Sequence, residues 1–360
     1  MEPSPLRAQF PVFEHVAYLN AGSCGPLPAA ALRAGADTAL QAAELGRGKW
    51  YFEALHAARD ALRARYAAAI DARPEDVALA TSTSEGMVRV LTGLGLQRGD
   101  EILTAEGEHP GLLGPLAAAR RGLGVEVRTA PLARIHEAVD PQRTRLVACS
   151  HVGWFSGEMA PAELAEVGRE IPVLLDGAQG AGAVRVDPEA LGCAFYAGAG
   201  QKWLCGPVGT GLLWISPRWR DRLPALGPTY ENLAVPSRGL DAEPWPDARA
   251  HDTPALAAQI MTAAEAAVGV LADAGWPTVF ERAATLAAQL ADRLVARGRT
   301  VGPRGRTTLV SWEDPDPEAL VARAAEQQVV IRNLPGTPYL RASVGAWNDE
   351  DDLERLLSHV

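Results

Sequence analysis

Short apolar runs alternate with longer amphipathic stretches along the first 216 residues. The apolar runs have the length of strands and lie at 75–81, 100–105, 123–130, 144–150, 172–176, 194–199 and 211–215. Apolar residues spaced three and four apart predict helices at 30–48, 51–70, 82–94, 114–123 and 161–170. Because the strands are strongly apolar and helices separate several of them, we expect an α/β fold with a largely parallel sheet covered on both faces.

The pattern changes after residue 216. The stretch 217–254 is rich in proline and has little periodicity, which is typical of a long functional loop or a connection between domains. An alanine-rich helix is predicted at 255–275, and helices and strands alternate again from there to residue 360. The final part has about 85 residues, an ordinary size for a compact α+β module.

Composition narrows the class of protein. Of the 360 residues 48% are hydrophobic and 22% charged, and the formal net charge is −10 without a long basic run. This balance argues against binding to nucleic acid or to a membrane surface. The first 13 residues lack the pattern of a signal peptide, and no run of ~18 apolar residues predicts a membrane span. We therefore expect a cytoplasmic protein.

Cysteine and histidine spacing gives no indication of a metal site. The four cysteines, at 24, 149, 193 and 205, form no C-x-x-C pair, and the seven histidines form no H-x-x-x-H or H-x-x-C cluster. We expect no structural metal and interpret the cysteines as small core residues rather than nucleophiles. Cys205 is the one closest in sequence to a candidate catalytic residue, Lys202.

Asp176 and Lys202 are the strongest candidates for chemistry. Asp176 ends an apolar strand, at the edge where open α/β sheets bind ligands, although a helix cap or a turn residue would explain the aspartate equally well. Lys202 lies among small, glycine-rich segments and is the only lysine after residue 49 in a chain that otherwise uses arginine. Such an amine can lose its proton and form a Schiff base, whereas the alternative is an ordinary surface lysine.

The segment "TSTSEG" at 81–86 lies between a predicted strand and a predicted helix. Its hydroxyls and backbone N–H groups would meet a helix N-terminus, which is a natural site for an anion such as phosphate. Ser82 and Glu85 also form an S-x-x-E capping pattern, and capping is compatible with phosphate binding. The segment lacks the P-loop pattern, so a nucleoside triphosphate is not indicated.

Taken together, "DGAQ" at 176–179, Lys202 and the following "GPVGTG" resemble the class V, fold type I pyridoxal-phosphate enzymes. That family includes cysteine desulfurases, isopenicillin-N-epimerase-like proteins and C–S lyases. The resemblance extends from "YLNAGSCGPLP" to "YLRASVGAWNDEDDLERLL". It implies a large domain at 18–255 with a mainly parallel seven-stranded sheet, and a small α+β domain made of 1–17 and 256–360 with the linking helix.

The resemblance also implies roles for individual residues. Lys202 would form an aldimine with pyridoxal 5'-phosphate and then move the α-proton of an amino-acid substrate, by way of a quinonoid. Asp176 would pair with the ring nitrogen, and His109 would stack on the ring. The remaining cofactor contacts would come from Gln179 at the ring oxygen, Thr83, Ser84 and Gln201 at the phosphate, and Thr253 at the phosphate of a neighbouring subunit in a homodimer. Arg341 and Trp154 would lie at the substrate.

Several of these residues have simpler explanations. His109 could shape the turn before Pro110, Gln179 could be a buried amide that satisfies backbone groups, and Arg341 could form a surface ion pair. Two positions also depart from the desulfurase pattern, since Gln201 replaces a histidine and Trp154 an asparagine.

The stretch 329–343 argues against persulfide formation, because desulfurases carry a nucleophilic cysteine there and this chain has none, unless Cys24 or Cys205 substitutes. From the overall resemblance to C–S lyases that lack this cysteine we expect a C–S β-lyase acting on a cysteine conjugate or S-oxide, with an aminotransferase or an epimerase as the alternatives. A non-catalytic α/β binding protein is the alternative from another class. As a further hypothesis, Trp154, Tyr230, Trp245 and Tyr339 line one enlarged substrate pocket.

Overall fold

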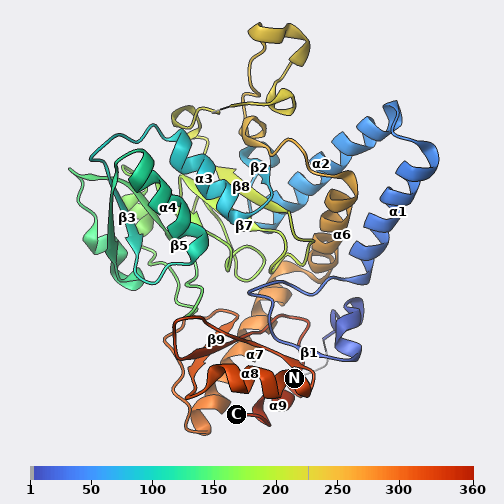
Figure 1. Ribbon diagram of the computed structural model, residues 1–360, viewed down its shortest axis with the longest axis vertical. Helices are drawn as coiled ribbons and strands as arrows, with labels where there is room; N and C mark the ends of the chain where they lie inside the picture. Colours follow the sequence, from blue (N-terminus) through green and yellow to red (C-terminus); the bar gives the residue numbers. More distant parts are fainter. Residues whose placement is uncertain (1–3, 226) are drawn as a thin grey trace.

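The computed structural model describes residues 4–225 and 227–360, and it divides visibly into a large α/β body and a smaller module (Figure 1). The chain's N-terminal segment lies beside the C-terminal module at the bottom of the view, while the yellow segment around residues 227–245 projects at the top. The predicted α/β fold is confirmed. The boundaries of the two domains stay a prediction.

A seven-stranded sheet forms the centre of the body. Its order is β2 (Val77–Ala80), β8 (Gly211–Ile215), β7 (Phe195–Ala199), β6 (Val173–Asp176), β5 (Thr144–Ser150), β3 (Glu101–Ala105) and β4 (Glu126–Ala130). All neighbours are parallel except β8, which runs antiparallel to both β7 and β2. The connection from β7 to β8 contains no helix, so the chain reverses there instead of crossing over.

The apolar strands are buried because helices cover both faces of this sheet. Every residue of β2, β3, β6, β7 and β8 is buried. Helices α3 (Thr83–Gly93) and α4 (Pro110–Gly122) pack on one face. On the other face lie α2 (Lys49–Ala69) and α6 (Ala258–Ala274), with α1 (Ala29–Leu45) packed against α6 (Figure 1). This arrangement leaves the carboxyl ends of the parallel strands free for a site.

The smaller module is built on a three-stranded antiparallel sheet. It contains β11 (Arg332–Asn333), β12 (Tyr339–Ser343), β9 (Leu309–Glu313) and the helices α7 (Trp276–Ala296), α8 (Pro317–Glu326) and α9 (Glu350–Leu357). The N-terminal segment joins it, because β1 (Ala17–Tyr18) pairs in parallel with β10 (Val329–Val330). Residues 17–25 therefore run from the small module to the large body.

Two predicted elements differ from the observed ones. The helix predicted at 161–170 is reduced to α5 (Leu164–Val167), which ends at Gly168, a poor helix former. The stretch "VVIRNL" at 329–334, expected as one element among the alternating helices and strands, is divided between β10 and β11, which belong to different sheets.

The helices and strands found among the described residues of the proline-rich part are short 3₁₀ turns and one isolated bridge between Leu233 and Pro244. The 3₁₀ turns of the described chain are η1 (Arg7–Gln9), η2 (Pro11–Glu14), η3 (Pro74–Asp76), η4 (Leu132–Ala138), η5 (Arg220–Arg222), η6 (Tyr230–Asn232), η7 (Pro236–Asp241) and η8 (Ala248–His251). None of the helices in the described part is both long and apolar enough to cross a membrane.

Candidate active site

The carboxyl ends of the central strands bring the two strongest candidates to the same edge of the sheet. Asp176 is the last residue of β6, with Ser150 opposite it on β5 and Ala197 opposite it on β7. Lys202 follows β7 by three residues. Asp176 is 5% exposed and accepts a hydrogen bond at Oδ1 from the backbone of Ala178, 2.9 Å away.

Lys202 and Asp176 influence each other's ionisation. Burial lowers the pKa of Lys202 to about 8, with Asp176 opposing the shift and Arg341 adding to it. Burial raises the pKa of Asp176, and the positive charge of Lys202 works against that rise. Within the described residues the Lys202 amine makes no hydrogen bond or ion pair, so the amine is available for covalent chemistry.

A tight turn fixes the backbone of Lys202. The carbonyl of Lys202 accepts a bond from the N–H of Cys205 at 3.1 Å, and Cys205 adopts a left-handed φ of 55°. The segment from the small module lies directly on this turn, since a Cβ at Gly25 would come within 2.0 Å of the Lys202 carbonyl oxygen. Only glycine can occupy position 25 at this approach.

His109 forms a wall of the site at the start of α4. Its Nδ1 accepts the N–H of Gly111 at 2.9 Å, so the ring caps the helix as well as preceding Pro110. The ring also meets Trp154 edge-on, with 5.1 Å between centroids. Burial lowers the pKa of His109 to about 4, helped by Lys202 and the nearby arginines, so the imidazole is neutral at ordinary pH.

The start of α3 offers the predicted anion site. Ser82 caps the helix by accepting the N–H of Glu85 at 3.2 Å, as the S-x-x-E pattern predicts. The Thr83 hydroxyl is buried without a hydrogen-bond partner, and a phosphate oxygen would satisfy it. Ser84 donates to the carbonyl of Gly111 at 3.0 Å, so phosphate binding by Ser84 would require its hydroxyl to rotate.

The two predicted glutamines differ in how many partners they already have. Gln179 donates to the Gly22 carbonyl at 2.8 Å and accepts the indole N–H of Trp203 at 2.9 Å. The amide thus satisfies protein groups, as its simpler explanation proposed, and one N–H of its NH₂ remains for a ligand. The Oε1 atom of Gln201 is buried without a partner.

Two arginines approach the site from the small module. Arg341 is 1% exposed and donates to the Trp154 carbonyl at 2.5 Å, while Arg332 lies opposite it on β11. Both point at the Ser23 hydroxyl, at 3.0 Å from Arg332 Nη1 and 3.4 Å from Arg341 Nη2. Neither forms an ion pair within the described chain. Arg341 is therefore no surface ion-pair residue, and both guanidinium groups are free for an anion.

Sequence reasoning missed Arg332 and Ser23. A signal for Arg332 was present, because "LPGTP" at 334–338 predicts a tight turn and a hairpin about that turn places residue 332 opposite residue 341. No local pattern pointed to Ser23.

The aromatic pocket predicted from sequence is only partly correct. Trp154 and Tyr339 line one cavity with His109 and Arg332. Tyr230 and Trp245 instead line a separate pocket beside α2, so their assignment to the same cavity is wrong. They belong to the proline-rich part, whose η6 turn is tied to residues 249–252 rather than to the edge of the sheet.

The thiols fall into two classes. Cys149, Cys193 and Cys205 are buried, and burial raises the pKa of each, so they stay protonated. Cys24 is partly exposed and lies close enough to Lys202 to affect the pKa of that amine. In the described residues no group of three or more His, Cys, Asp or Glu is arranged to hold a metal ion.

Thr253 lies under strand β2. Its N–H donates to the Leu79 carbonyl at 2.7 Å, and its own carbonyl accepts a bond from buried Arg59 at 3.1 Å. Asp252, beside it, pairs with Arg63 through two hydrogen bonds. The segment is thus held rigidly, and its predicted contact with a neighbouring subunit stays a prediction.

The residues fit the coenzyme that the sequence resemblance implies. A buried amine without a hydrogen-bond partner lies near an aspartate, and the Thr83 hydroxyl is buried without a partner. The Nε of Arg341 is likewise buried and unpartnered. Each of these groups lacks a partner that pyridoxal phosphate or an amino-acid carboxylate would supply.

Comparison with known proteins gives a consistent result. A family model described as aminotransferase class-V matches residues 18–356. A probable cysteine desulfurase of Pseudomonas aeruginosa is 30% identical, covering 98% of this chain and 96% of the relative. An isopenicillin N epimerase of Amycolatopsis lactamdurans is 36% identical over 58% of the chain and 56% of the relative.

Two solved structures of C-DES match nearly the whole chain. Their TM-scores are 0.90 and 0.89 at 25% identity, with 98% and 97% of this chain and 98% of each of theirs covered. One is a variant with glycine covalently linked to the PLP cofactor. The other is the cystine C–S lyase in complex with its reaction product, cysteine persulfide.

Proposed function

The chain belongs to the aminotransferase class-V family of pyridoxal-phosphate enzymes, and from this premise we propose that it is a C–S β-lyase acting on a cysteine conjugate or a cysteine S-oxide. Because the chain belongs to this enzyme family, the alternative of a non-catalytic binding protein is set aside. The description of C-DES as a cystine C–S lyase supports including disulfides of cysteine among the conjugates.

One hairpin carries the proposal. Strands β11 and β12 present Arg332 and Arg341 to the site, and the turn between them, 334–338, contains no cysteine. A desulfurase needs a protein thiolate to take sulfur from the substrate, and this hairpin supplies none. The two guanidinium groups can hold the substrate carboxylate. Because no protein thiolate takes the sulfur, the sulfur would leave the substrate together with its own substituent.

The residues divide the work of elimination between them. When bound, pyridoxal phosphate supplies an electron sink that makes the α-proton of the substrate acidic. Lys202 would hold the coenzyme and later take that proton on Nζ, while Asp176 would keep a proton on the ring nitrogen. Arg341 would fix the α-carboxylate and His109 would exclude water from one ring face. Loss of the α-proton would let the Cβ–S bond break with its electron pair on sulfur, and addition of water to the released three-carbon enamine would give pyruvate and ammonia.

Product analysis with a substrate panel tests the proposal. The panel contains cystine, S-substituted cysteines, cysteine S-oxides and plain amino acids. A β-lyase releases pyruvate and ammonia in equal amounts from the sulfur compounds without a co-substrate. Keto acid formed only with an amino acceptor would instead establish an aminotransferase. Inversion at Cα, detected by chiral chromatography, would establish an epimerase, the activity named for the Amycolatopsis relative.

The proposal includes a cytoplasmic homodimer in which Thr253 reaches the coenzyme phosphate of the neighbouring subunit. The rigid anchoring of residues 252–254 by Arg59 and Arg63 supports a fixed reach. Mixing the Lys202→Ala and Thr253→Ala variants tests it. If Thr253 acts between subunits, each mixed dimer contains one intact site and activity returns. If mixing returns no activity while light scattering shows mixed dimers, the proposed reach is wrong.

A further inference from the structure

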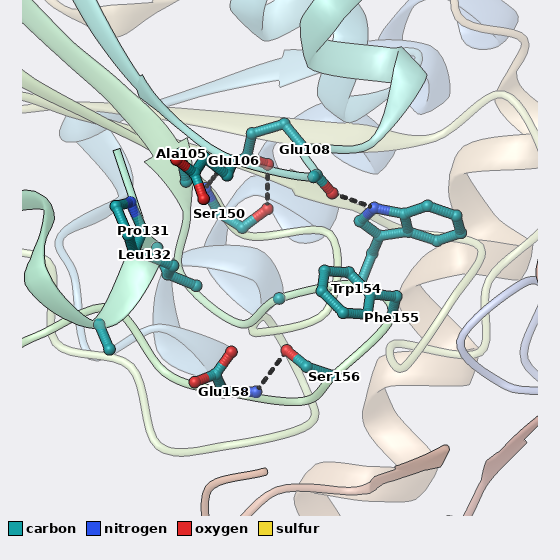
Figure 2. Close-up of a pocket in the computed structure, with 13 residues that line it drawn as sticks. Ala105, Glu106, Glu108, Pro131, Leu132, Ser150, Trp154, Phe155, Ser156 and Glu158 are labelled. Atoms are coloured by element: carbon teal, nitrogen blue, oxygen red, sulfur yellow. Dashed lines mark hydrogen bonds between the residues drawn. The ribbon is translucent and has the colours of Figure 1, made fainter. Parts of the chain in front are cut away.

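The turn that carries His109 has little packing support on one side. Residues 106–109 connect β3 to α4 through Gly107, which has a left-handed φ of 71°. Behind the turn lies a cavity of about 170 Å³ (Figure 2). Its lining includes Glu108, Ser150, Trp154 and Phe155. Phe155 packs against Gly107, but the cavity leaves the rest of this side of the turn with few van der Waals contacts.

Hydrogen bonds hold the turn instead. Both carboxylate oxygens of Glu108, which is 4% exposed, bind Ser150: Oε1 accepts the backbone N–H at 2.6 Å and Oε2 accepts the hydroxyl at 2.5 Å. A third hydrogen bond runs from the Trp154 indole N–H to the Gly107 carbonyl at 2.8 Å (Figure 2). Ser150 ends β5 directly opposite Asp176 on β6. Glu108 therefore connects the residue beside it, His109, to the strand end beside Asp176.

From this geometry we propose that Glu108 is a positioning residue, which clamps the His109 turn to the end of β5 and so sets the distance between the ring-face wall and Asp176. Neither Glu108 nor Ser150 contacts substrate in this role; they act through His109. The inference rests on coenzyme binding by this family member and is independent of which substrate the enzyme uses.

The effect of the Glu108 hydrogen bonds can be separated from the effect of its negative charge by substitution with glutamine. Asp176 on β6 and Cys149 on β5 are the titratable groups that interact with it, the backbone of His109 hydrogen-bonds to it, and Glu106 and Glu158 line the same cavity. Burial raises the pKa of Glu108 to about 7, the bonds from Ser150 oppose the rise, and Asp176 adds to it. A glutamine would keep both bonds, because its carbonyl accepts the N–H and its NH₂ donates to the Ser150 oxygen.

Four variants of the holoenzyme test the clamp: Glu108→Ala, Glu108→Gln, Ser150→Ala and the control Glu106→Gln. Glu106 is exposed and lies two residues away on the same turn. The main measurement is the visible circular dichroism of bound coenzyme, which reports how the ring is held. We expect Glu108→Ala to lose most of the dichroic band and roughly 100-fold in kcat/KM. Glu108→Gln and Glu106→Gln should keep the wild-type band, and Ser150→Ala should give an intermediate one.

Three outcomes overturn the inference. A wild-type band in Glu108→Ala would remove any positioning role, and an equal loss in Glu108→Gln would assign the effect to charge. If Glu108→Ala does not fold, Ser150→Ala decides, since it deletes only one hydroxyl; an unchanged band there also refutes the clamp. Failure of the C–S lyase proposal would leave this result unaffected, because dichroism is read without substrate.

Discussion

The two walls of the active site manage charge in opposite ways. On the wall formed by the central sheet, Lys202 and Asp176 carry opposite charges, and each affects the pKa of the other although they form no ion pair. On the wall formed by the small module, Arg332 and Arg341 lie side by side with no acidic partner in the described chain. The first wall is balanced before any ligand arrives, and the second is not.

This difference separates the sites of two kinds of ligand. Burial lowers the pKa of Arg341 to about 9, and Arg332 contributes, which means that the folded protein disfavours its own positive charge there. A substrate carboxylate would remove that penalty each time it binds and restore it on leaving. A coenzyme that stays bound through many turnovers suits the balanced wall instead. Charge balance thus distinguishes a resident ligand from a transient one.

Replacing the amine of the balanced wall should have the largest effect. The chain has two lysines, and Lys49 is 90% exposed at the start of α2. We expect Lys202→Ala to lower turnover roughly 10⁴-fold, because it removes both the covalent anchor and the proton carrier. Lys49→Ala should match the wild type. Borohydride reduction followed by peptide mass spectrometry locates the coenzyme, and an adduct at Lys49 would contradict the assignment.

Replacing Arg341 on the unbalanced wall should lower activity and raise the stability of the substrate-free protein. Arg341→Met should lower kcat/KM by roughly 100-fold through loss of a charge-assisted carboxylate contact. It should also stabilise the substrate-free protein by about 1 kcal/mol, because a buried unpaired charge is removed.

Arg63 is the matched control for this trade. It is equally buried but pairs with Asp252. Arg63→Met should cost about 3 kcal/mol, since the Asp252 carboxylate loses its closest cation and keeps Arg59 at 3.4 Å. Urea unfolding measures both variants, and a loss of stability in Arg341→Met of the same size would show that the two arginines are alike.

The pH dependence of coenzyme capture sharpens the comparison further. Because the pKa of Lys202 is lowered to about 8, the amine is protonated and unreactive below that pH and neutral above it. Capture of pyridoxal phosphate by the apoenzyme should accelerate about tenfold per pH unit up to about 8 and then level off. Asp176→Asn should move the midpoint down, because Asp176 raises the pKa of Lys202. Stopped-flow absorbance measures the rate of capture in the wild type and in Asp176→Asn. A midpoint that moves up in the variant would contradict the claim that Asp176 raises the pKa of Lys202.

The smallest effect is expected at the thiols. Cys24→Ser and Cys205→Ala should each change kcat/KM for β-elimination by less than about threefold. Pyruvate release measures this, with the double variant as a check on mutual replacement. A persulfide found on Cys24 by mass spectrometry, together with loss of sulfur release in Cys24→Ser, would make the enzyme a desulfurase after all.

The parts of the molecule that depend on short-range pattern could be predicted from the sequence. Asp176 and Lys202 follow apolar strands of one sheet, so topology alone places them on a common edge. The Ser82–Glu85 cap is likewise local. The antiparallel direction of β8 was not predicted, because strand composition does not record direction when both neighbours are buried.

Contacts between distant segments were out of reach. Glu108 meets Ser150 across 42 residues, and Ser23 meets Arg332 across 309. Nothing near Glu108 or Ser23 in the chain distinguishes them from a surface acid or a loop serine. The turn at 334–338 shows the boundary between the two cases. The turn is enough to predict that Arg332 pairs with Arg341 across the hairpin. It does not predict that neither arginine has an acidic side chain as an ion-pair partner in the described chain.

The approach of Gly25 to the Lys202 carbonyl has a mechanical consequence. Residues 17–25 are fastened at one end to β10 and press at the other on the turn that bears the lysine. If the small module tilted to admit a bulky substrate, residues 17–25 would move with it. Their movement would shift the turn from which the Lys202 side chain extends. Substrate entry and the position of the Lys202 amine would then be coupled. Inserting one residue into the segment 17–25 would remove this coupling.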